Sequence, residues 1–345
     1  MNELGMPCRI LMKRKLFCVP SLAALALIPL LDACGPLVPA VTSCQTDAEL
    51  PTKERESIGQ VAVKFVDDSL SPTPSAAYTT FTAATRASLS IEQFMAGFQK
   101  PVMARGPFKD WRVTHIYRVQ VTGGIQRQQV VCGDGSRPEG WVAVNAEPRM
   151  VEANVIVEGQ TVNNVHAVVV RLRPEAENWR VHSVHFATTG MAGKSAEDLR
   201  RVAEVEHQRQ HSFNAFILYT TAMQLADTGP FLRLGVRSKI EEEMTKVVKP
   251  SILEGASPFS WTFEGSTFKV MNVGPIGVGG KLYLLVDHEI EPWSQDKVAD
   301  QSNRDLIAGL NRSVAEYKEA FAGLVIRAHE RGGPRGFGTV HENDK

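Results

Sequence analysis

Apolar residues recur with a helical period in the first part of the chain. They lie three and four positions apart over residues 57–70, which predicts an amphipathic helix. A second helix is expected over residues 75–89. Ser90 is a suitable N-cap for a third, because its hydroxyl can accept a hydrogen bond from a free backbone N–H group. Gly106-Pro107 is expected to end this helical section.

From Trp111 onward the period changes from helical to two. Alternating segments separated by turn residues predict successive strands of an antiparallel sheet. The expected strands cover residues 111–121, 128–132, 141–145, 150–158, 165–173 and 179–187. Helices followed by strands are typical of the α+β class, with the helices packed on one face of a bent sheet.

The second half of the chain repeats this change of period. A long helix over residues 194–227 is expected to join the two halves. Further elements are expected as helices over 238–248 and 300–321, strands over 259–263, 267–273 and 281–290, and a closing hairpin of 324–328 and 336–340. The sequence therefore predicts two α+β domains, residues 54–190 and 212–345, with residues 191–211 as a helical connector.

The N-terminal residues have the pattern of an export signal. The basic cluster Met12-Lys13-Arg14-Lys15 precedes an apolar run, residues 16–31, that prolines interrupt. A basic head, an apolar middle and a small residue before the cleavage point define a secretory signal, expected here over residues 1–33. Because the basic cluster begins at Met12, we expect Met12 to be the true start.

The end of this signal resembles the lipobox of bacterial lipoproteins. The stretch Leu31-Asp32-Ala33-Cys34-Gly35 has leucine three positions before the cysteine and small residues on either side of it. The resemblance implies that Cys34 is acylated and becomes the mature N-terminus, although Asp32 departs from the small or apolar residue usual at that position. Gly35 resembles the residue of lipoproteins sorted to the outer membrane, so a periplasm-facing anchor there is expected. Residues 34–53 are expected to form a flexible tether.

Two of the five cysteines are left unassigned by this interpretation. Cys8 and Cys18 leave with the signal, and Cys34 carries the lipid. Cys44 and Cys132 remain in an oxidising compartment, where they form either a disulfide or two independent small apolar positions. Zinc is not expected, because neither has a cysteine or histidine at ligand spacing.

Residues 54–190 resemble the cystatin-like or ketosteroid-isomerase-like fold. The resemblance rests on three helices followed by a bent sheet, with the phrase Leu89-Ser90-Ile91-Glu92-Gln93-Phe94 and the last strand Glu177-Asn178-Trp179-Arg180-Val181. It implies either an apolar ligand pocket or a plain packed core. The side chains expected to line this pocket are Phe81, Phe94, Phe98, Trp111 and Tyr117. No catalytic residue is carried over, and residues 212–345 resemble no family.

Three groups of residues in the second half have side chains suited to catalysis or ligand binding. Asp287, Glu289 and Glu291 share one strand face and, with His329, would form an acid/base or metal group; the alternative is a solvent-facing polar surface. The run from Gly274 to Gly280 would cradle a phosphate or connect a hairpin; the hairpin is favoured, because Leu282 and a strand follow Lys281. The stretch with Arg327, His329, Arg331 and Arg335 would grip an anion or carry ordinary surface charges.

Charge and composition narrow the function further. The 38 basic residues balance the 38 acidic ones, which argues against nucleic acid as a partner. We therefore expect a membrane-anchored lipoprotein with a non-catalytic binding, scaffolding or envelope-assembly role. Its partners would be the membrane, through the lipid, and an envelope protein or small ligand, with no cofactor or metal. The alternative is an envelope enzyme or a carrier of a small apolar ligand.

Overall fold

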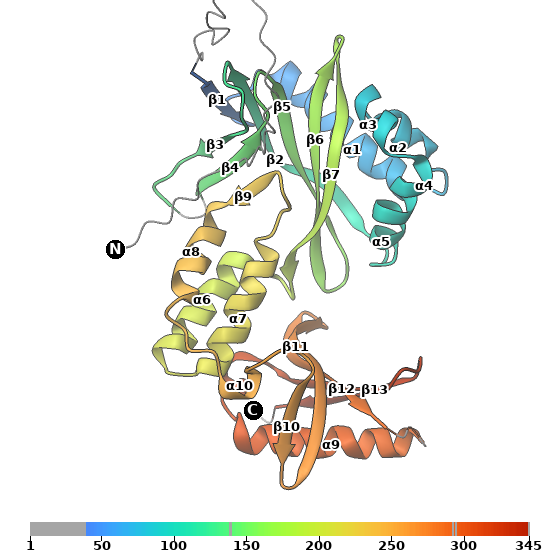
Figure 1. Cartoon of the computed structure of the whole chain (residues 1–345), viewed down its shortest axis with the longest axis vertical. Helices are drawn as coiled ribbons and strands as arrows, with labels where there is room; N and C mark the ends of the chain where they lie inside the picture. Colours follow the sequence, from blue (N-terminus) through green and yellow to red (C-terminus); the bar gives the residue numbers. More distant parts are fainter. Residues whose placement is uncertain (1–38, 138–139, 292, 294, 344–345) are drawn as a thin grey trace, which may run out of the picture. The chain divides into compact units, whose positions relative to one another are not determined.

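The chain has the α+β architecture that its periodicity predicts, with helices and curled antiparallel sheets (Figure 1). The computed structural model describes residues 39–137, 140–291, 293 and 295–343. The expected signal and Cys34 lie outside these residues. In the part of the chain that is described, no helix is long and apolar enough to cross a membrane.

Helices form the first section after residue 51. They are α1 (Thr52–Leu70), α2 (Ser75–Thr79), α3 (Ala83–Ser88), α4 (Ile91–Phe94) and α5 (Lys100–Met103), with a π-helical turn, Met95–Gln99, before α5. The second expected helix is divided into α2 and α3. The division has a cause in tertiary contacts, because Thr80 O accepts a bond from Val181 N, and Thr82 N donates to Val181 O. Ser90 caps α4 through a capping box with Gln93, as expected.

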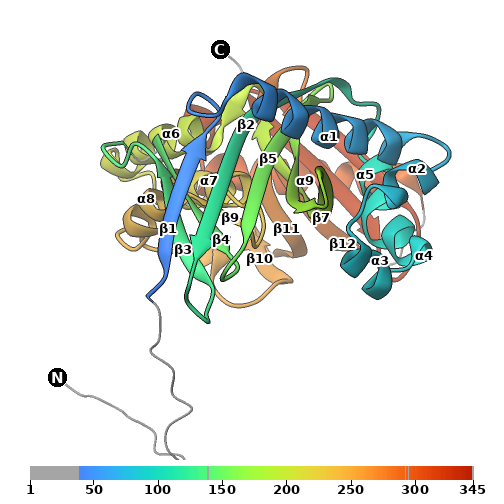
Figure 2. The ribbon, with the colours of Figure 1, turned by 90° about the horizontal axis from the view of Figure 1, so that it is seen from above.

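These helices pack on one face of a six-stranded antiparallel sheet. Its strand order is β1-β2-β5-β6-β7-β8. The strands are β1 (Val41–Thr46), β2 (Lys109–Thr122), β5 (Val151–Gln160), β6 (Asn164–Glu175), β7 (Asn178–Met191) and β8 (Lys194–Ser195). Helix α1 crosses the sheet and contacts β2, β5, β6 and β7 (Figure 2). Ile58 and Phe65 of α1 are fully buried in the core between the two layers.

Strand β1 lies within the segment that was expected to be a flexible tether. Residues 34–53 were expected to be flexible, but Val41–Thr46 pairs antiparallel with β2, with Cys44 opposite Val119. Helix α1 then begins at Thr52. Residues 41–46 of the expected tether therefore belong to the folded body, because β2 offers an edge with free hydrogen-bonding groups that β1 satisfies.

A smaller sheet lies against the other face of the six-stranded sheet. It consists of β3 (Gln128–Gly133), β4 (Trp141–Ala146) and β9 (Leu232–Leu234), in that order. Its side chains share a core with Val119 and Val169 of the larger sheet. Strand β9, which the sequence pattern did not predict, belongs to the expected second domain, yet Leu232 pairs with Val144 of β4. The pairing of β4 with β9 therefore crosses the boundary expected between residues 54–190 and 212–345.

The expected long connecting helix is a helical hairpin. Helices α6 (Ala196–Gln208) and α7 (Ser212–Leu225) pack against each other, and the chain turns at Gln210, which has a φ of +64°. Leu199 and Ala203 of α6 are fully buried in the core of the second half. The expected connector, residues 191–211, is thus part of the folded core of the second half. One side of its charged sequence is apolar and packs on α7.

The remaining elements include a five-stranded sheet that α9 covers on one face. They are α8 (Gly235–Met244), a 3-10 turn (Ser251–Leu253), β10 (Phe259–Phe263), β11 (Ser266–Val278), β12 (Lys281–Ile290), α9 (Asp296–Ser313), α10 (Tyr317–Ala320), β13 (Gly323–Glu330) and β14 (Gly336–Glu342). The strands lie in sequence order, and α9 connects the parallel pair β12 and β13. The glycine-rich run is a hairpin, as favoured, with Gly279 and Gly280 at positive φ between β11 and β12.

Candidate functional site

A cavity of about 300 Å³ lies on the face of the six-stranded sheet opposite α1–α5. Three groups of elements enclose it: strands β2, β5 and β7, strands β4 and β9, and the ends of α6, α7 and α8. The lining residues are His115, Tyr117, Trp141, Val142, Ile156, Glu158, Thr189, Ser195, Ala196, Glu197, Leu225, Thr228, Leu234, Gly235 and Val236. Its wall therefore brings together residues from both halves of the chain.

Aromatic rings form one side of this cavity. His115 and Tyr117 lie two positions apart on β2, so they share a face, and their ring centroids are 5.9 Å apart in a stacked arrangement. Trp141, the first residue of β4, also lines the wall. Burial raises the pKa of Tyr117 to about 12, with the negative charge of Asp47 adding to the shift. The phenol therefore stays neutral at physiological pH and presents an uncharged ring.

Two carboxylates also reach the cavity wall. Glu158 Oε1 accepts a hydrogen bond from Thr189 Oγ1 at 3.2 Å. Glu197, at the start of α6, forms ion pairs with Arg200 and Arg201. Bonds to Arg200 are the main reason that the pKa of Glu197 lies below its usual value. The side chains that line the cavity, all within the described residues, include no lysine or arginine.

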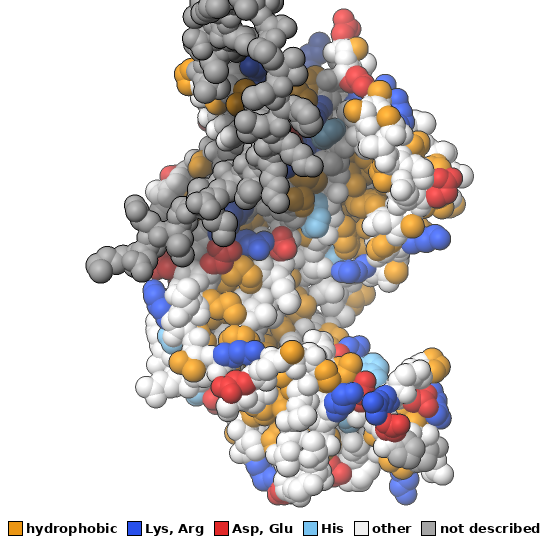
Figure 3. Space-filling model, in the orientation of Figure 1, with side chains coloured by type: hydrophobic (Ala, Val, Ile, Leu, Met, Phe, Trp, Pro, Cys, Tyr) orange, Lys and Arg blue, Asp and Glu red, His pale blue; other side chains and the backbone are white. Residues whose placement is uncertain are grey.

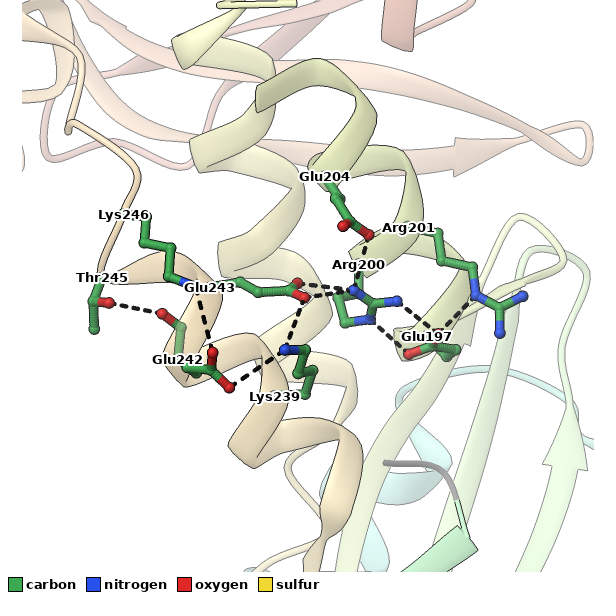
Figure 4. Close-up of polar contacts among 9 residues, drawn as sticks. All are labelled: Glu197, Arg200, Arg201, Glu204, Lys239, Glu242, Glu243, Thr245 and Lys246. Carbon is green, nitrogen blue, oxygen red and sulfur yellow. Dashed lines mark hydrogen bonds and ion pairs between the residues drawn. The ribbon is translucent and has the colours of Figure 1, made fainter. Parts of the chain in front are cut away.

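Glu197 belongs to an ion-pair network that joins α6 to α8 (Figure 4). Arg200 lies between Glu197 and Glu243, and its Nη1 is 2.8 Å from Glu243 Oε1. Lys239 pairs with Glu243 as well. Hydrogen bonds to Glu197 and Glu243 raise the pKa of Arg200. The network holds the N-terminal end of α6, and with it Glu197, at the edge of the cavity.

The side chains of the expected apolar pocket do not share one site. Phe81, Phe94 and Phe98 pack together, with ring centroids 5.4 Å and 5.6 Å apart, and line a hollow of about 470 Å³ beside β7. Trp111 packs on the same core and contacts Phe108 but does not line this hollow, and Tyr117 faces the cavity on the other side of the sheet.

The separation of Tyr117 follows from an irregularity of β2. The register with β5 shifts between Val113 and His115, so the strand does not keep a strict alternation of faces. Val113 and Ile116 consequently both face the helices, and Tyr117 turns to the opposite face. The expectation that Tyr117 lines one pocket with the phenylalanines was therefore wrong, whereas Trp111 packs on their core without lining the hollow. His115, Trp141 and Glu158 were missed, although the two-residue spacing of His115 and Tyr117 would have grouped that pair.

A second polar hollow borders the pocket of phenylalanines. Arg105, His166 and His185 line it, and the guanidinium of Arg105 lies 5.5 Å from the centre of the Phe186 ring. Burial, with a smaller contribution from Arg105, lowers the pKa of His166 to about 4. His166 Nε2 is buried and has no hydrogen-bond partner among the described residues. The histidine is thus neutral and packs as a ring on Phe186.

Cys44 and Cys132 are joined by a disulfide. The bond connects β1 to β3, and the two Cα atoms are 5.5 Å apart. Of the two alternatives for these cysteines, the structure contains the disulfide. It attaches the edge strand to the smaller sheet, next to the buried side chains Val119 and Val144.

Each charged residue proposed as a site in the second half has a partner of opposite charge. Asp287 binds Arg327 and His329, with Arg327 Nε 2.6 Å from its Oδ1. Burial raises the pKa of Asp287, but the hydrogen bonds from Arg327 and Asn272 outweigh this effect and hold the pKa below its usual value. The remaining pairs are Glu289 with Lys269, Glu291 with Arg331, and Arg335 with Glu330. Figure 3 shows charges of both signs gathered over β12 and β13.

His288 is separate from this surface. It points to the other face of β12, where it is buried, and its Nε2 lies 2.7 Å from Asn303 Oδ1. Glu291 and the arginines therefore form the solvent-facing charged surface that was one of the two alternatives, whereas Asp287 is buried beside Arg327. Over the described ranges, no three histidine, cysteine, aspartate or glutamate side chains gather as metal ligands would.

Comparisons with known proteins add no relationship: no family model, curated protein or solved structure matches this chain.

Proposed function

We propose that this chain is an exported lipoprotein, anchored in a bacterial membrane through Cys34, with a non-catalytic binding role in the envelope. The observation that carries the proposal is the disulfide between Cys44 and Cys132. Disulfides persist in oxidising compartments and are rare in the cytosol. The bond thus agrees with the export signal over residues 12–35, which the lipobox-like stretch completes.

Binding rather than catalysis is supported by how the ionisable groups are used. Asp287 and Glu243 are each occupied by an ion pair with an arginine. His166 and His182 are neutral rings whose pKa values burial lowers to about 4. The cavity beside Tyr117 has a mainly apolar and aromatic wall, the composition typical of ligand sites. A small ligand or an envelope protein is the proposed partner.

The anchor is tested by replacing the acylated cysteine. We expect Cys34→Ala to release the protein from membranes or to leave it as an unprocessed precursor, because neither lipid attachment nor cleavage can then occur. Cell fractionation and intact mass measure both outcomes. Cys18→Ala, which changes a cysteine within the expected signal, is the matched control and should leave the membrane-bound form unchanged. A Cys34→Ala protein that fractionates with membranes at the normal mature mass would contradict the proposal.

We also propose that residues 54–190 are related to the cystatin-like or ketosteroid-isomerase-like fold. Support comes from the order of elements, since α1–α5 precede the adjacent strands β2, β5, β6 and β7 and cover one face of their sheet. Strands β3 and β4 lie between β2 and β5 in the sequence and leave this sheet, which distinguishes the chain from a plain arrangement of that kind. An experimental structure with another strand order would refute this relationship.

A further inference from the structure

We propose that the cavity beside Tyr117 binds a small organic cation, a molecule with an ammonium group on an apolar body. The proposal goes beyond a general binding role, and it does not depend on the membrane anchor. It rests on three features of the wall: aromatic side chains, a carboxylate that pairs with no basic residue in the described part of the chain, and apolar side chains around them.

The carboxylate is Glu158. Within the described residues, the hydroxyl of Thr189 is the one side-chain donor that reaches it, at 3.2 Å. The other acid of the wall, Glu197, is already neutralised by Arg200 and Arg201. Glu158 is therefore the carboxylate of the wall for which the described residues supply no ion-pair partner, and a negative charge next to a low-dielectric wall attracts a cation more strongly than it would in water.

The aromatic residues favour an organic cation over a metal ion. Tyr117 and Trp141 line the cavity, and the electron-rich face of a tyrosine or tryptophan ring attracts ammonium groups. A metal ion would need several oxygen or nitrogen ligands, but no group of three acidic, histidine or cysteine side chains gathers among the described residues. An alkylammonium group satisfies Glu158 and the rings together.

The apolar part of the ligand has a matching surface. Val142, Ile156, Leu225, Leu234 and Val236 line the remainder of the wall. The volume of about 300 Å³ is at the lower end of the range for small-molecule sites. The site therefore suits a compact molecule of the size of choline or benzyltrimethylammonium rather than a lipid chain or a peptide.

The test compares a cation with a neutral molecule of the same shape. Calorimetric titration of the purified full-length protein, in a detergent without a cationic group, uses choline and its uncharged isostere 3,3-dimethyl-1-butanol. We expect saturable binding of choline that is at least about tenfold tighter than binding of the alcohol, a difference of about 1.4 kcal/mol. Equal affinities, or no saturable binding of choline and of benzyltrimethylammonium, would overturn the proposal.

Variants locate the binding site. Glu158→Gln should weaken choline binding about tenfold and leave binding of the alcohol unchanged, while Trp141→Leu should weaken choline binding without changing the net charge. Glu289→Gln is the matched control, because Glu289 pairs with Lys269 on the C-terminal sheet, outside the cavity. If Glu158→Gln fails to fold, Trp141→Leu and the comparison of the two ligands still decide the outcome. Unchanged choline binding in a folded Glu158→Gln protein would also overturn the proposal.

Discussion

Arg200 of α6 binds both carboxylate oxygens of Glu243 of α8, with Nη1 2.8 Å from Oε1 and 2.9 Å from Oε2. Both side chains are largely buried, with 11% of each exposed. The same guanidinium binds Glu197 at the cavity wall. One arginine therefore fixes the helical layer that forms a side of the cavity.

Removal of this arginine should destabilise the protein more than removal of its neighbour. We expect Arg200→Met to lower the free energy of unfolding by about 2–4 kcal/mol, because it leaves the buried carboxylate of Glu243 with only its longer ion pair to Lys239, at 3.7 Å. Arg201→Met is the matched control: Arg201 also pairs with Glu197, but it is 61% exposed, so its loss should cost about 1 kcal/mol or less. Urea unfolding followed by circular dichroism measures both.

A double variant separates the ion pair from general packing. Combining Arg200→Met with Glu243→Gln should cost less than the sum of the two single changes, since no uncompensated charge then remains. Equal destabilisation by Arg200→Met and Arg201→Met, or strictly additive effects in the double variant, would contradict the role given to Arg200.

Loss of the disulfide should destabilise the fold through the unfolded state. The bond joins residues 88 positions apart, so Cys44→Ala with Cys132→Ala frees a long loop in the unfolded chain. We expect the free energy of unfolding to fall by about 2–5 kcal/mol. Chemical denaturation of oxidised protein measures the change, and the reduced wild type should behave nearly as the double variant does. Two alkylatable thiols in protein taken from the envelope would show that the bond does not form there.

Acidification should destabilise the protein through its buried histidines. The pKa of His166 is about 4 in the folded state, chiefly because of burial, whereas an unfolded histidine has a pKa near 6.5. The unfolded chain therefore binds protons first, so the contribution of the neutral ring is complete above pH 6.5 and declines as the pH falls towards 4. His182, whose pKa burial also lowers to about 4, adds a decline in the same direction.

The substitution His166→Phe should reduce this decline. Phenylalanine keeps a ring against Phe186 and has no proton to bind, so we expect the loss of stability between pH 7 and pH 4.5 to shrink by roughly 1–3 kcal/mol. Urea midpoints at several pH values measure the slope, and His207→Gln, at the end of α6, serves as the control. The explanation fails if wild type and His166→Phe lose the same stability on acidification.

Local patterns along the chain predicted most elements of this fold. Three examples are the N-cap Ser90, the change of period near Trp111, and the turn at Gly279 and Gly280. Each depends on backbone geometry within a few residues of the signal. Strands β10 and β12 begin and end where alternation predicts. Such features are readable from sequence because the burial of one face imposes a period on neighbouring positions.

The candidate cavity was not readable in the same way. Periodicity indicates that a residue is buried, but it does not indicate against which partner. The register shift between Val113 and His115 moved Tyr117 to the other face of its sheet, and a strand of only three residues, β9, closed the cavity from a distant part of the chain. The register shift and the pairing of β9 both depend on contacts between strands that are far apart in the sequence.

The sequence by itself determined the α+β class, and it predicts an export signal that ends before Cys34 and leaves Cys44 and Cys132 to pair. Only the tertiary structure decided that residues 196–225 form a hairpin of two helices, that β4 pairs with β9, and that Glu158 shares a cavity with Tyr117 and Trp141. The physical reason is range: period, caps and turns are local preferences, whereas a cavity arises where segments far apart in the sequence pack together without filling the space between them.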